Sequence, residues 1–241
     1  MTRVFVLTDN VSIYTNFRAV LDNVKDVEFE VSYAYSPSSE NLFSGLKGIE
    51  SFDIKKNYKS LIGHVDLIIS CHCKKIFPAE LVNRVKCINI HPGLNPYNRG
   101  WYPQVFAINN GMPHGATIHE MDEEIDHGNI IVQEEIKIEQ TDTSKSVYDK
   151  VVLAELKMFK QHVSSLISGA YKAKKMVHEG NYNSISDFNE LCKIDMNKGG
   201  TFREFYNLLR SLQHEPYSNA YFFDDNGDKV YIEIKITKQT G

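Results

Sequence analysis

The sequence predicts an α/β protein with a mostly parallel sheet, followed by a small α+β domain that contains a β-hairpin. Apolar strand-like segments alternate with segments of helical periodicity through most of the 241 residues, an order that produces a parallel sheet covered by helices. After about residue 180 this alternation stops, and a helix and a strand pair follow. We therefore expect two domains, at residues 1–180 and 181–241.

Each strand and helix of the first domain is predicted from its own pattern. VDLIISC (65–71) is a continuous apolar run, typical of a parallel strand that is buried on both faces. Apolar side chains at helical spacing predict the helices, whereas the serine-rich segment 36–48 is expected to be a loop. The expected strands are 4–8, 27–35, 65–71, 86–91, 116–121 and 129–138, and the expected helices are 11–24, 77–85, 101–111 and 144–167.

The second domain begins with weak signals and ends with strong ones. Thr201 and Glu204 form a capping-box pattern at the start of a helix over 201–212. The segment 219–236 reads as a hairpin, in which Asn226-Gly227 favours a type I′ turn. A unit of about sixty residues is small for independent stability, so we expect it to dock on the first domain or on a partner chain.

The composition excludes several classes of protein. The net charge is −4, from 27 basic and 31 acidic residues without a basic stripe, which argues against nucleic acid as a partner. No apolar run is long enough to span a membrane, and a strand that begins within three residues leaves no room for a signal peptide. Four cysteines without a CxxC pair favour a reduced protein. We expect a cytoplasmic location without membrane contact.

The strand KCINIH (86–91) contains two polar residues that an apolar strand does not need. Asn is depleted in strands, and a buried amide loses stability unless it finds partners. Alternation places Asn89 and His91 on the same side of the strand, at its carboxyl end. In an open parallel sheet, ligands bind at that edge, so these two side chains are candidates for chemistry.

A second polar cluster, HEMDEEIDHGN (119–129), lies between two expected strands. Asp126 comes before His127-Gly128 in a tight turn, where its carboxylate can meet His91. Taken singly, each residue has an ordinary interpretation: Asn89 as a cap, His91 as a loop histidine and Asp126 as a turn former. Taken together, they favour a functional site.

Metal binding is the sharpest alternative for these histidines. In HEMDE, Glu123 rather than a histidine stands four residues after His119, so the segment is not HExxH. If the strand continued through residue 73, His72 would point to the face opposite Cys71 and Cys73. We therefore expect no metal site. The possible ligands are Cys71, His72, Cys73, His91, His114, His119 and His127.

The loop PGLNPYNRGWYP (92–103) allows two interpretations. In one, it is a rigid loop that packs Trp101 and Tyr102 into the core. In the other, it is the wall of a binding cleft, in which Arg99 meets a phosphate and the aromatic rings meet a flat ring. The residues alone leave both interpretations open.

Together these motifs resemble the folate-dependent formyltransferases. That family has an Asn-x-His-Pro strand end, a Pro-x-x-x-Gly loop and a Gly-x-Thr-x-His … Asp-x-Gly segment. Here they are Asn89 to Pro92, Pro96 to Gly100, Gly115 to His119 and Asp126 to Gly128. NIHPGLNPYNRGWYPQVFAI (89–108) is similar, more narrowly, to the sugar nucleotide N-formyltransferases. The acidic chain lacks the basic C-terminal barrel of methionyl-tRNA formyltransferases.

The resemblance implies a Rossmann-like formyltransferase domain and a homodimer. It implies transfer of a formyl group from N10-formyltetrahydrofolate to a dTDP-linked amino-dideoxy sugar, for O-antigen or another surface glycan. The preferred acceptor is a 3-amino-3,6-dideoxyhexose, and a 4-amino sugar is the alternative. A formyltetrahydrofolate hydrolase and a non-catalytic nucleotide-binding module are the alternatives from other classes.

The resemblance also assigns roles to residues. Asn89 would donate a hydrogen bond to the oxyanion, and His91 would act as base or, when charged, stabilise that oxyanion. Asp126 would orient His91 and raise its pKa. The folate would contact Ser70, Lys74, Ile76, Met121 and Asp122. The sugar nucleotide would contact Asn95, Tyr97, Asn98, Arg99, Trp101, Tyr217 and Tyr221, although both tyrosines also suit the small domain's core.

Overall fold

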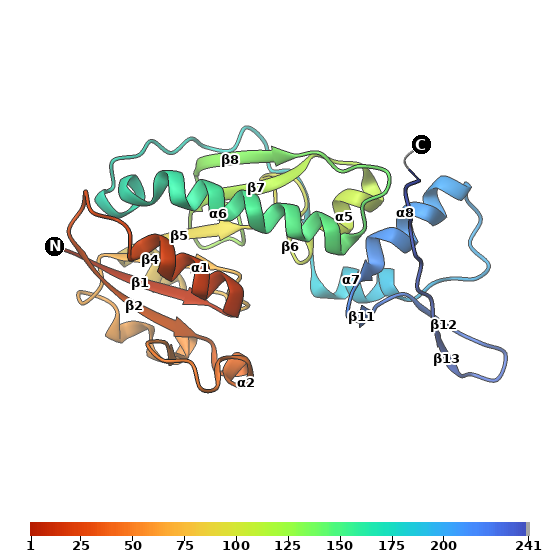
Figure 1. The fold of residues 1–241 in the computed structure, drawn as a ribbon, viewed down its shortest axis with the longest axis horizontal. Coiled ribbons are helices and arrows are strands. Elements are labelled where there is room, and N and C mark those ends of the chain that lie inside the picture. The colour runs from red at the N-terminus through yellow and green to blue at the C-terminus, as the bar shows by residue number, and fades with distance from the viewer. Residues whose placement is uncertain (240–241) are drawn as a thin grey trace.

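The computed structural model describes residues 1–239, and its centre is a seven-stranded sheet (Figure 1). The strand order is β3-β2-β1-β4-β5-β7-β8. The first five strands in this order are parallel to one another, and β7 and β8 are antiparallel to their neighbours. The predicted mostly parallel sheet is therefore confirmed. The strands are β1 (Thr2–Thr8), β2 (Phe29–Tyr35), β3 (Glu50–Ser51), β4 (Leu67–Cys71), β5 (Lys86–His91), β7 (His114–Glu120) and β8 (Ile130–Ile136).

Helices cover both faces of this sheet. The long helix α6 (Ser144–Ser168) lies beside α1 (Val11–Leu21) on one face (Figure 1), where the rings of Phe17 and Phe159 stack at 4.0 Å. Ile68 of β4 points to the other face, where it shares a core with Ile54 and Leu81. The helical elements on this face are α3 (Ile54–Asn57), η2 (Tyr58–Ser60) and α4 (Ala79–Arg84). Two further short elements, η1 (Pro37–Ser39) and α2 (Glu40–Phe43), follow β2, and Phe43 packs against Tyr14 of α1. The predicted loop over 36–48 is thus partly helical.

The helix α5 (Pro103–Asn110) connects the two parts of the chain. It ends at Gly111, whose φ of 73° is the left-handed conformation that glycine adopts without strain, as its sequence predicts. Val105 of α5 shares a buried cluster with Cys192, Leu212 and Ala220. The C-terminal part therefore docks on the first domain. Two short strands, β6 (Arg99–Gly100) and β9 (Tyr182–Asn183), also pair here.

The C-terminal elements lie at one end of the molecule, beyond α5 (Figure 1). Thr201 and Glu204 bond each other's backbone N–H groups in the predicted capping box. The elements are α7 (Ile185–Cys192), α8 (Phe202–Leu212), β10 (Gln213–His214), β11 (Tyr217–Ser218), β12 (Tyr221–Phe223) and β13 (Lys229–Tyr231). The boundary at residue 180 stays a prediction.

The C-terminal hairpin is confirmed, but its predicted type I′ turn is wrong. A type I′ turn needs two central residues with positive φ, and here Gly227 has a φ of 84° while Asn226 does not have a positive φ. The connection runs from Asp224 to Asp228, and the Asp224 carboxylate accepts the N–H groups of Asn226 and Asp228. The Gly227 N–H also donates to the Asp224 backbone oxygen at 3.0 Å, so a backbone turn over Asp224 to Gly227, supported by the Asp224 side chain, stands in place of the type I′ turn.

None of the helices within residues 1–239 is both long enough and apolar enough to cross a bilayer.

Candidate active site

A cavity of about 900 Å³ lies at the carboxyl ends of β1, β4 and β5 and reaches the C-terminal elements. This is the edge at which open α/β sheets bind ligands. Both domains contribute to its wall. Lining residues include Asp9, Asn10, Ser70, His72, Lys74, Ile76, Asn89, His91, Trp101, Met121, Asp122, Asp126, Ser144, Tyr148, Phe188, His214 and Tyr217.

The structure brings Asn89, His91 and Asp126 together at the end of β5. Asn89 Nδ2 donates to Asp126 Oδ1 at 3.0 Å, and His91 Nδ1 lies 3.4 Å from Asp126 Oδ2. The other ring nitrogen, Nε2 of His91, is buried and has no hydrogen-bond partner within residues 1–239. The three side chains line one cavity, with a free imidazole nitrogen among them.

The turn at Asp126 is held in place by its neighbours. Asp126 has a φ of 50°, a left-handed conformation in which Asp is enriched. Its backbone oxygen accepts from Asn95 Nδ2 at 2.8 Å, and its carboxylate accepts from the Gly100 N–H at 3.1 Å. A side chain at Gly128 would collide with the backbone of Glu120. These contacts fix the direction of the carboxylate.

Burial decides the charge of His91. Loss of hydration lowers the pKa of His91 to about 4, and although the Asp126 carboxylate raises it, burial prevails. Asp126 raises the pKa of His91, as expected, but it does not bring that pKa back to the ordinary value of a histidine. Burial also raises the pKa of Asp126, but His91, His119 and the Gly100 N–H outweigh it and hold that pKa below its usual range. The site thus pairs a neutral imidazole with a carboxylate.

His119 is a member of this cluster that the sequence analysis did not assign to the site. Its Nε2 lies 3.5 Å from Asp126 Oδ1 and 3.4 Å from Asn89 Nδ2, and its Nδ1 donates to the Glu120 backbone oxygen at 2.6 Å. The signal was present, because His119 ends the Gly-x-Thr-x-His motif. Thr117 of the same motif supports the loop after β5 by donating to the Gly93 oxygen at 2.7 Å.

The five side chains expected to contact folate all line the cavity. They are Ser70, Lys74, Ile76, Met121 and Asp122. Asp9, which the sequence analysis did not single out, holds this region: its carboxylate accepts the N–H of Lys74 at 2.9 Å and the N–H of Ser36 at 2.8 Å. It therefore fixes the segment after β4 to the end of β2.

Of the seven side chains expected to contact the sugar nucleotide, some line the cavity and others do not. Trp101 and Tyr217 line the cavity. Tyr221 packs in the C-terminal cluster, with Lys229 Nζ 3.7 Å from its ring centre. The others, Asn95, Tyr97, Asn98 and Arg99, lie outside the cavity wall.

Arg99 and Asn98 have structural contacts instead. The Arg99 side chain is buried, and its Nη1 donates to the Ile125 backbone oxygen at 3.3 Å. Asn98 is fully buried and bonds Asn110 and Asn181 at 2.8 Å each. Each interpretation therefore holds for part of the loop: Asn98 and Arg99 are held in a buried stretch, whereas Trp101 and Tyr102 line the cavity and are not packed into the core. Tyr102 packs against Phe188 of α7, with ring centres 4.3 Å apart.

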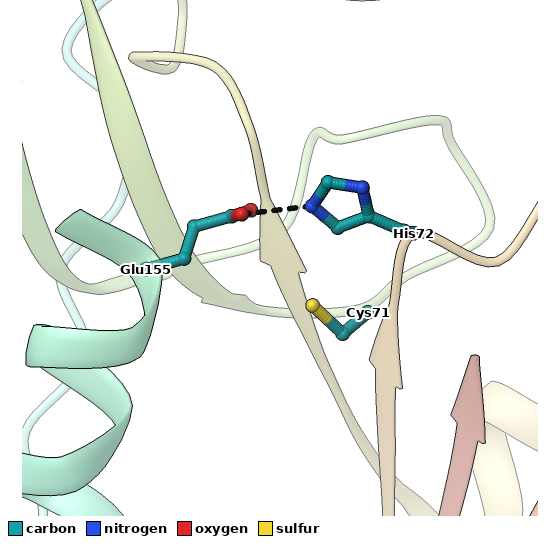
Figure 2. A group of neighbouring side chains, drawn as sticks. All are labelled: Cys71, His72 and Glu155. Atoms are coloured by element: carbon teal, nitrogen blue, oxygen red, sulfur yellow. Dashed lines mark hydrogen bonds and ion pairs between the residues drawn. The ribbon is translucent and has the colours of Figure 1, made fainter. Parts of the chain in front are cut away.

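A second carboxylate–histidine pair is formed by His72, which lines the cavity, and Glu155, which is buried behind it (Figure 2). The expectation that His72 points away from Cys71 is wrong, because β4 ends at Cys71 and His72 has a φ of 53°. Cys71, His72 and Glu155 place possible metal ligands within 4.8 Å of one another, as do the more exposed Glu124, His127 and Glu179. Since His72 and Glu155 bond each other at 2.8 Å, we assign no metal to the first group.

Two protein families and a relative of known activity match this chain in sequence. Residues 7–163 match the family described as formyl transferase, and residues 187–238 match the N-formyltransferase dimerization C-terminal domain. A dTDP-4-amino-4,6-dideoxyglucose formyltransferase from Mycobacterium bovis is 39% identical over 233 residues, which cover 97% of this chain and 96% of that protein.

Two solved structures are similar over nearly the whole chain. A 4-N formyltransferase from Francisella tularensis is 46% identical, covers 99% of both chains and has a TM-score of 0.95. A sugar N-formyltransferase from a Shewanella species is 41% identical, covers 100% of both and has a TM-score of 0.94. With the family match over more than half of the chain, we conclude that the protein belongs to the formyl transferase family and is an N-formyltransferase.

Proposed function

We propose that the protein transfers a formyl group from N10-formyltetrahydrofolate to the amine of a dTDP-linked 4-amino-4,6-dideoxyhexose. The observation that carries this proposal is the unpartnered, buried Nε2 of His91, a residue that lines the cavity together with Asn89 and Asp126. A formyl transfer needs a base for the amine proton, a donor for the oxyanion and room for two substrates. The cavity offers all three.

His91 acts as the base in this proposal. Its Nδ1 faces the Asp126 carboxylate, so Nδ1 carries the hydrogen and Nε2 keeps a lone pair. A pKa of about 4 leaves the ring neutral at pH 7 and able to accept a proton. When Nε2 takes the proton of the attacking amine, the carboxylate of Asp126 stabilises the imidazolium. Burial disfavours the alternative in which His91 is already charged at the start of the reaction and stabilises the oxyanion.

Asn89 supplies the oxyanion donor. Its Nδ2 bonds Asp126 at 3.0 Å and approaches His119 at 3.4 Å. The second contact is long for a hydrogen bond, so this N–H is the one that can turn to the oxygen of the tetrahedral carbon. Removing one such donor typically lowers kcat by about two to three orders of magnitude.

The position of the amine on the hexose is inferred from the similar proteins. The relatives at 39% and 46% identity carry 4-amino and 4-N in their names, and they favour the 4-amino alternative over the 3-amino preference of the sequence analysis. The aromatic wall at Trp101, Tyr102, Phe188 and Tyr217 suits the thymine ring. The Arg99 guanidinium is buried and lies outside the cavity wall, so the phosphate contact expected of it is not part of this proposal.

The proposal also includes the folate contacts, the cellular location, the oligomeric state and the use of the product. Folate contacts Ser70, Lys74, Ile76, Met121 and Asp122, as their place in the wall supports. The protein acts in the cytoplasm as a homodimer through residues 181–241, which the match to a dimerization domain supports. Its formylated sugar is destined for O-antigen or a related surface glycan.

The test is an end-point assay with N10-formyltetrahydrofolate and dTDP-linked 3-amino and 4-amino dideoxyhexoses, analysed by mass spectrometry. We expect one formyl group to be added to a 4-amino sugar. Formate release without a formylated sugar would favour the hydrolase instead. Binding of both ligands without turnover would favour a non-catalytic nucleotide-binding module.

A further inference from the structure

A second polar group lies in the cavity wall, on the side of α6. Glu155 is fully buried, and its Oε2 bonds His72 Nε2 at 2.8 Å (Figure 2), while Oε1 has no partner within residues 1–239. His72 lines the cavity, and its side chain is 10% exposed. Its left-handed backbone, at a φ of 53°, turns the imidazole toward α6. The pair therefore connects the cavity to a buried carboxylate.

Tyr148, two turns before Glu155 on α6, completes this group. Its hydroxyl lies 3.1 Å from His72 Nδ1 and 3.1 Å from Asn10 Nδ2. The orientation of Asn10 is fixed, because its Oδ1 accepts the N–H of Ile13 as the N-cap of α1. Asn10 Nδ2 therefore donates to the Tyr148 oxygen.

The direction of the second bond follows from the charge of the buried pair. Unlike Asp126, Glu155 has no donor other than His72 within residues 1–239 and is fully buried, so its charge is compensated by a proton on the carboxyl or by a charged imidazole. If His72 carries the charge, both ring nitrogens hold hydrogens. If Glu155 holds the proton instead, it donates to Nε2, and the ring hydrogen is on Nδ1. In both arrangements, His72 Nδ1 donates to the Tyr148 oxygen.

Tyr148 is then left with one free donor. A phenol oxygen accepts two hydrogen bonds and donates one, and Asn10 and His72 fill the two accepting positions. Burial raises the pKa of Tyr148 above its ordinary value, so the hydroxyl keeps its hydrogen at working pH. Because Tyr148 lines the cavity, this O–H is available to a bound molecule.

We propose that Tyr148 donates its O–H to an oxygen of the sugar nucleotide, and that His72 and Glu155 are positioning residues that keep it turned to the cavity. This inference rests on the proposed function. Tyr148 lies beside His214, with ring centres 5.5 Å apart, and His214 lies 6.2 Å from Tyr217. These residues form the side of the cavity assigned to the sugar nucleotide rather than to folate. The acceptor is a diphosphate oxygen or a sugar hydroxyl.

Isothermal titration calorimetry with the Tyr148→Phe variant tests this proposal. We expect the affinity for dTDP-4-amino-4,6-dideoxyglucose to fall about tenfold to one hundredfold for a charged acceptor, and less for a hydroxyl. A matching loss with dTDP alone identifies the diphosphate, and a loss confined to the complete sugar nucleotide identifies the sugar. Folate affinity should not change.

Tyr206→Phe is the matched control, because the Tyr206 hydroxyl bonds the Gln140 oxygen outside the cavity. Unchanged affinity of Tyr148→Phe for both ligands, with a wild type that binds them, overturns the inference and leaves the proposed function intact. A wild type that binds no sugar nucleotide overturns both.

The positioning role needs a separate measurement. In the double variant His72→Leu with Glu155→Leu, the Tyr148 hydroxyl loses the donor that directs it. We expect Tyr148→Phe to weaken sugar-nucleotide binding less in this background than in the wild type, and to change KM more than kcat in both. An equal loss in the two backgrounds overturns the role of His72 and Glu155.

Discussion

Asp126 and Glu155 are two carboxylates that each face a histidine of the same cavity, yet their surroundings differ: the Asp126 side chain is 10% exposed, whereas Glu155 is fully buried. Asp126 lies in a loop, where it accepts from Asn89 and Gly100 and has two histidines nearby. Glu155 lies within α6, where a helix offers it no free backbone N–H, and it bonds His72. Asp126 thus has hydrogen-bond donors besides its histidines, and these stay in place when His91 is neutral. Glu155 has His72 as its partner, and its other oxygen has none within residues 1–239.

The largest effect expected from this difference is on turnover. His91→Ala removes the base beside Asp126 and should lower kcat by about two to four orders of magnitude. It should leave sugar-nucleotide affinity nearly unchanged, in contrast to Tyr148→Phe. Steady-state kinetics measures both, with His64→Ala as a control outside the cavity. A variant that keeps full turnover would remove His91 from the mechanism.

The next largest effect is on the stability of the protein, and it concerns His72 and Glu155. His72→Leu leaves Glu155 buried without a partner, which should lower the free energy of unfolding by about 3–5 kcal/mol. The double replacement His72→Leu with Glu155→Leu removes both polar groups and should recover most of that loss. Denaturant unfolding of the single and double variants measures this. Equal stability of the two would show that Glu155 does not depend on His72.

A smaller but sharp effect is expected at Gly93. A Cβ there would collide with Nε2 of His91, so Gly93→Ala should displace the imidazole. A misplacement of about 1 Å can lower the rate about one hundredfold. Gly199→Ala is the matched control, because a Cβ at that position meets no atom within 4 Å. If the Gly93→Ala variant keeps the wild-type turnover rate, the rate does not depend on the position of the His91 ring.

The smallest effect is a proton titration. His91 should stay uncharged down to about pH 4, whereas a histidine in the unfolded chain takes up its proton near pH 6.5. Between these values the unfolded chain binds the additional proton, so lowering the pH favours unfolding. Because the Asp126 carboxylate raises the pKa of His91, Asp126→Asn should lower it further. NMR of the imidazole Cε1 protons measures both, and titration of His91 near pH 6.5 would contradict the neutral base.

The two clusters also differ in how far the sequence predicted them. Asn89 and His91 are two residues apart on one strand, so strand periodicity was enough to place them side by side. Asp126 lies 37 residues after Asn89, and the resemblance to a family motif supported the prediction that it joins them. Glu155 lies 83 residues after His72, and nothing in its helix distinguishes it from an exposed glutamate. Strand alternation pointed His72 the wrong way, because a single left-handed residue ends β4 early.

The loop over 95–99 is a second place where the residue types alone did not predict the contacts. Its residue types suit a phosphate site, but Asn95 and Arg99 bond the backbone around Asp126 instead. Sequence identifies a donor such as a guanidinium, whereas the fold decides which acceptor it meets.

The sequence by itself determined the alternation of strands and helices, the capped helix at Thr201, the hairpin and the Asn89, His91 and Asp126 set. These depend on local periodicity, on short spacings and, for Asp126, on the family motif, which the chain carries wherever it folds. The tertiary structure decided the burial that keeps His91 neutral, the turning of Arg99 away from the cavity and the pairing of His72 with Glu155. Burial and long-range hydrogen bonds depend on segments that packing alone brings together.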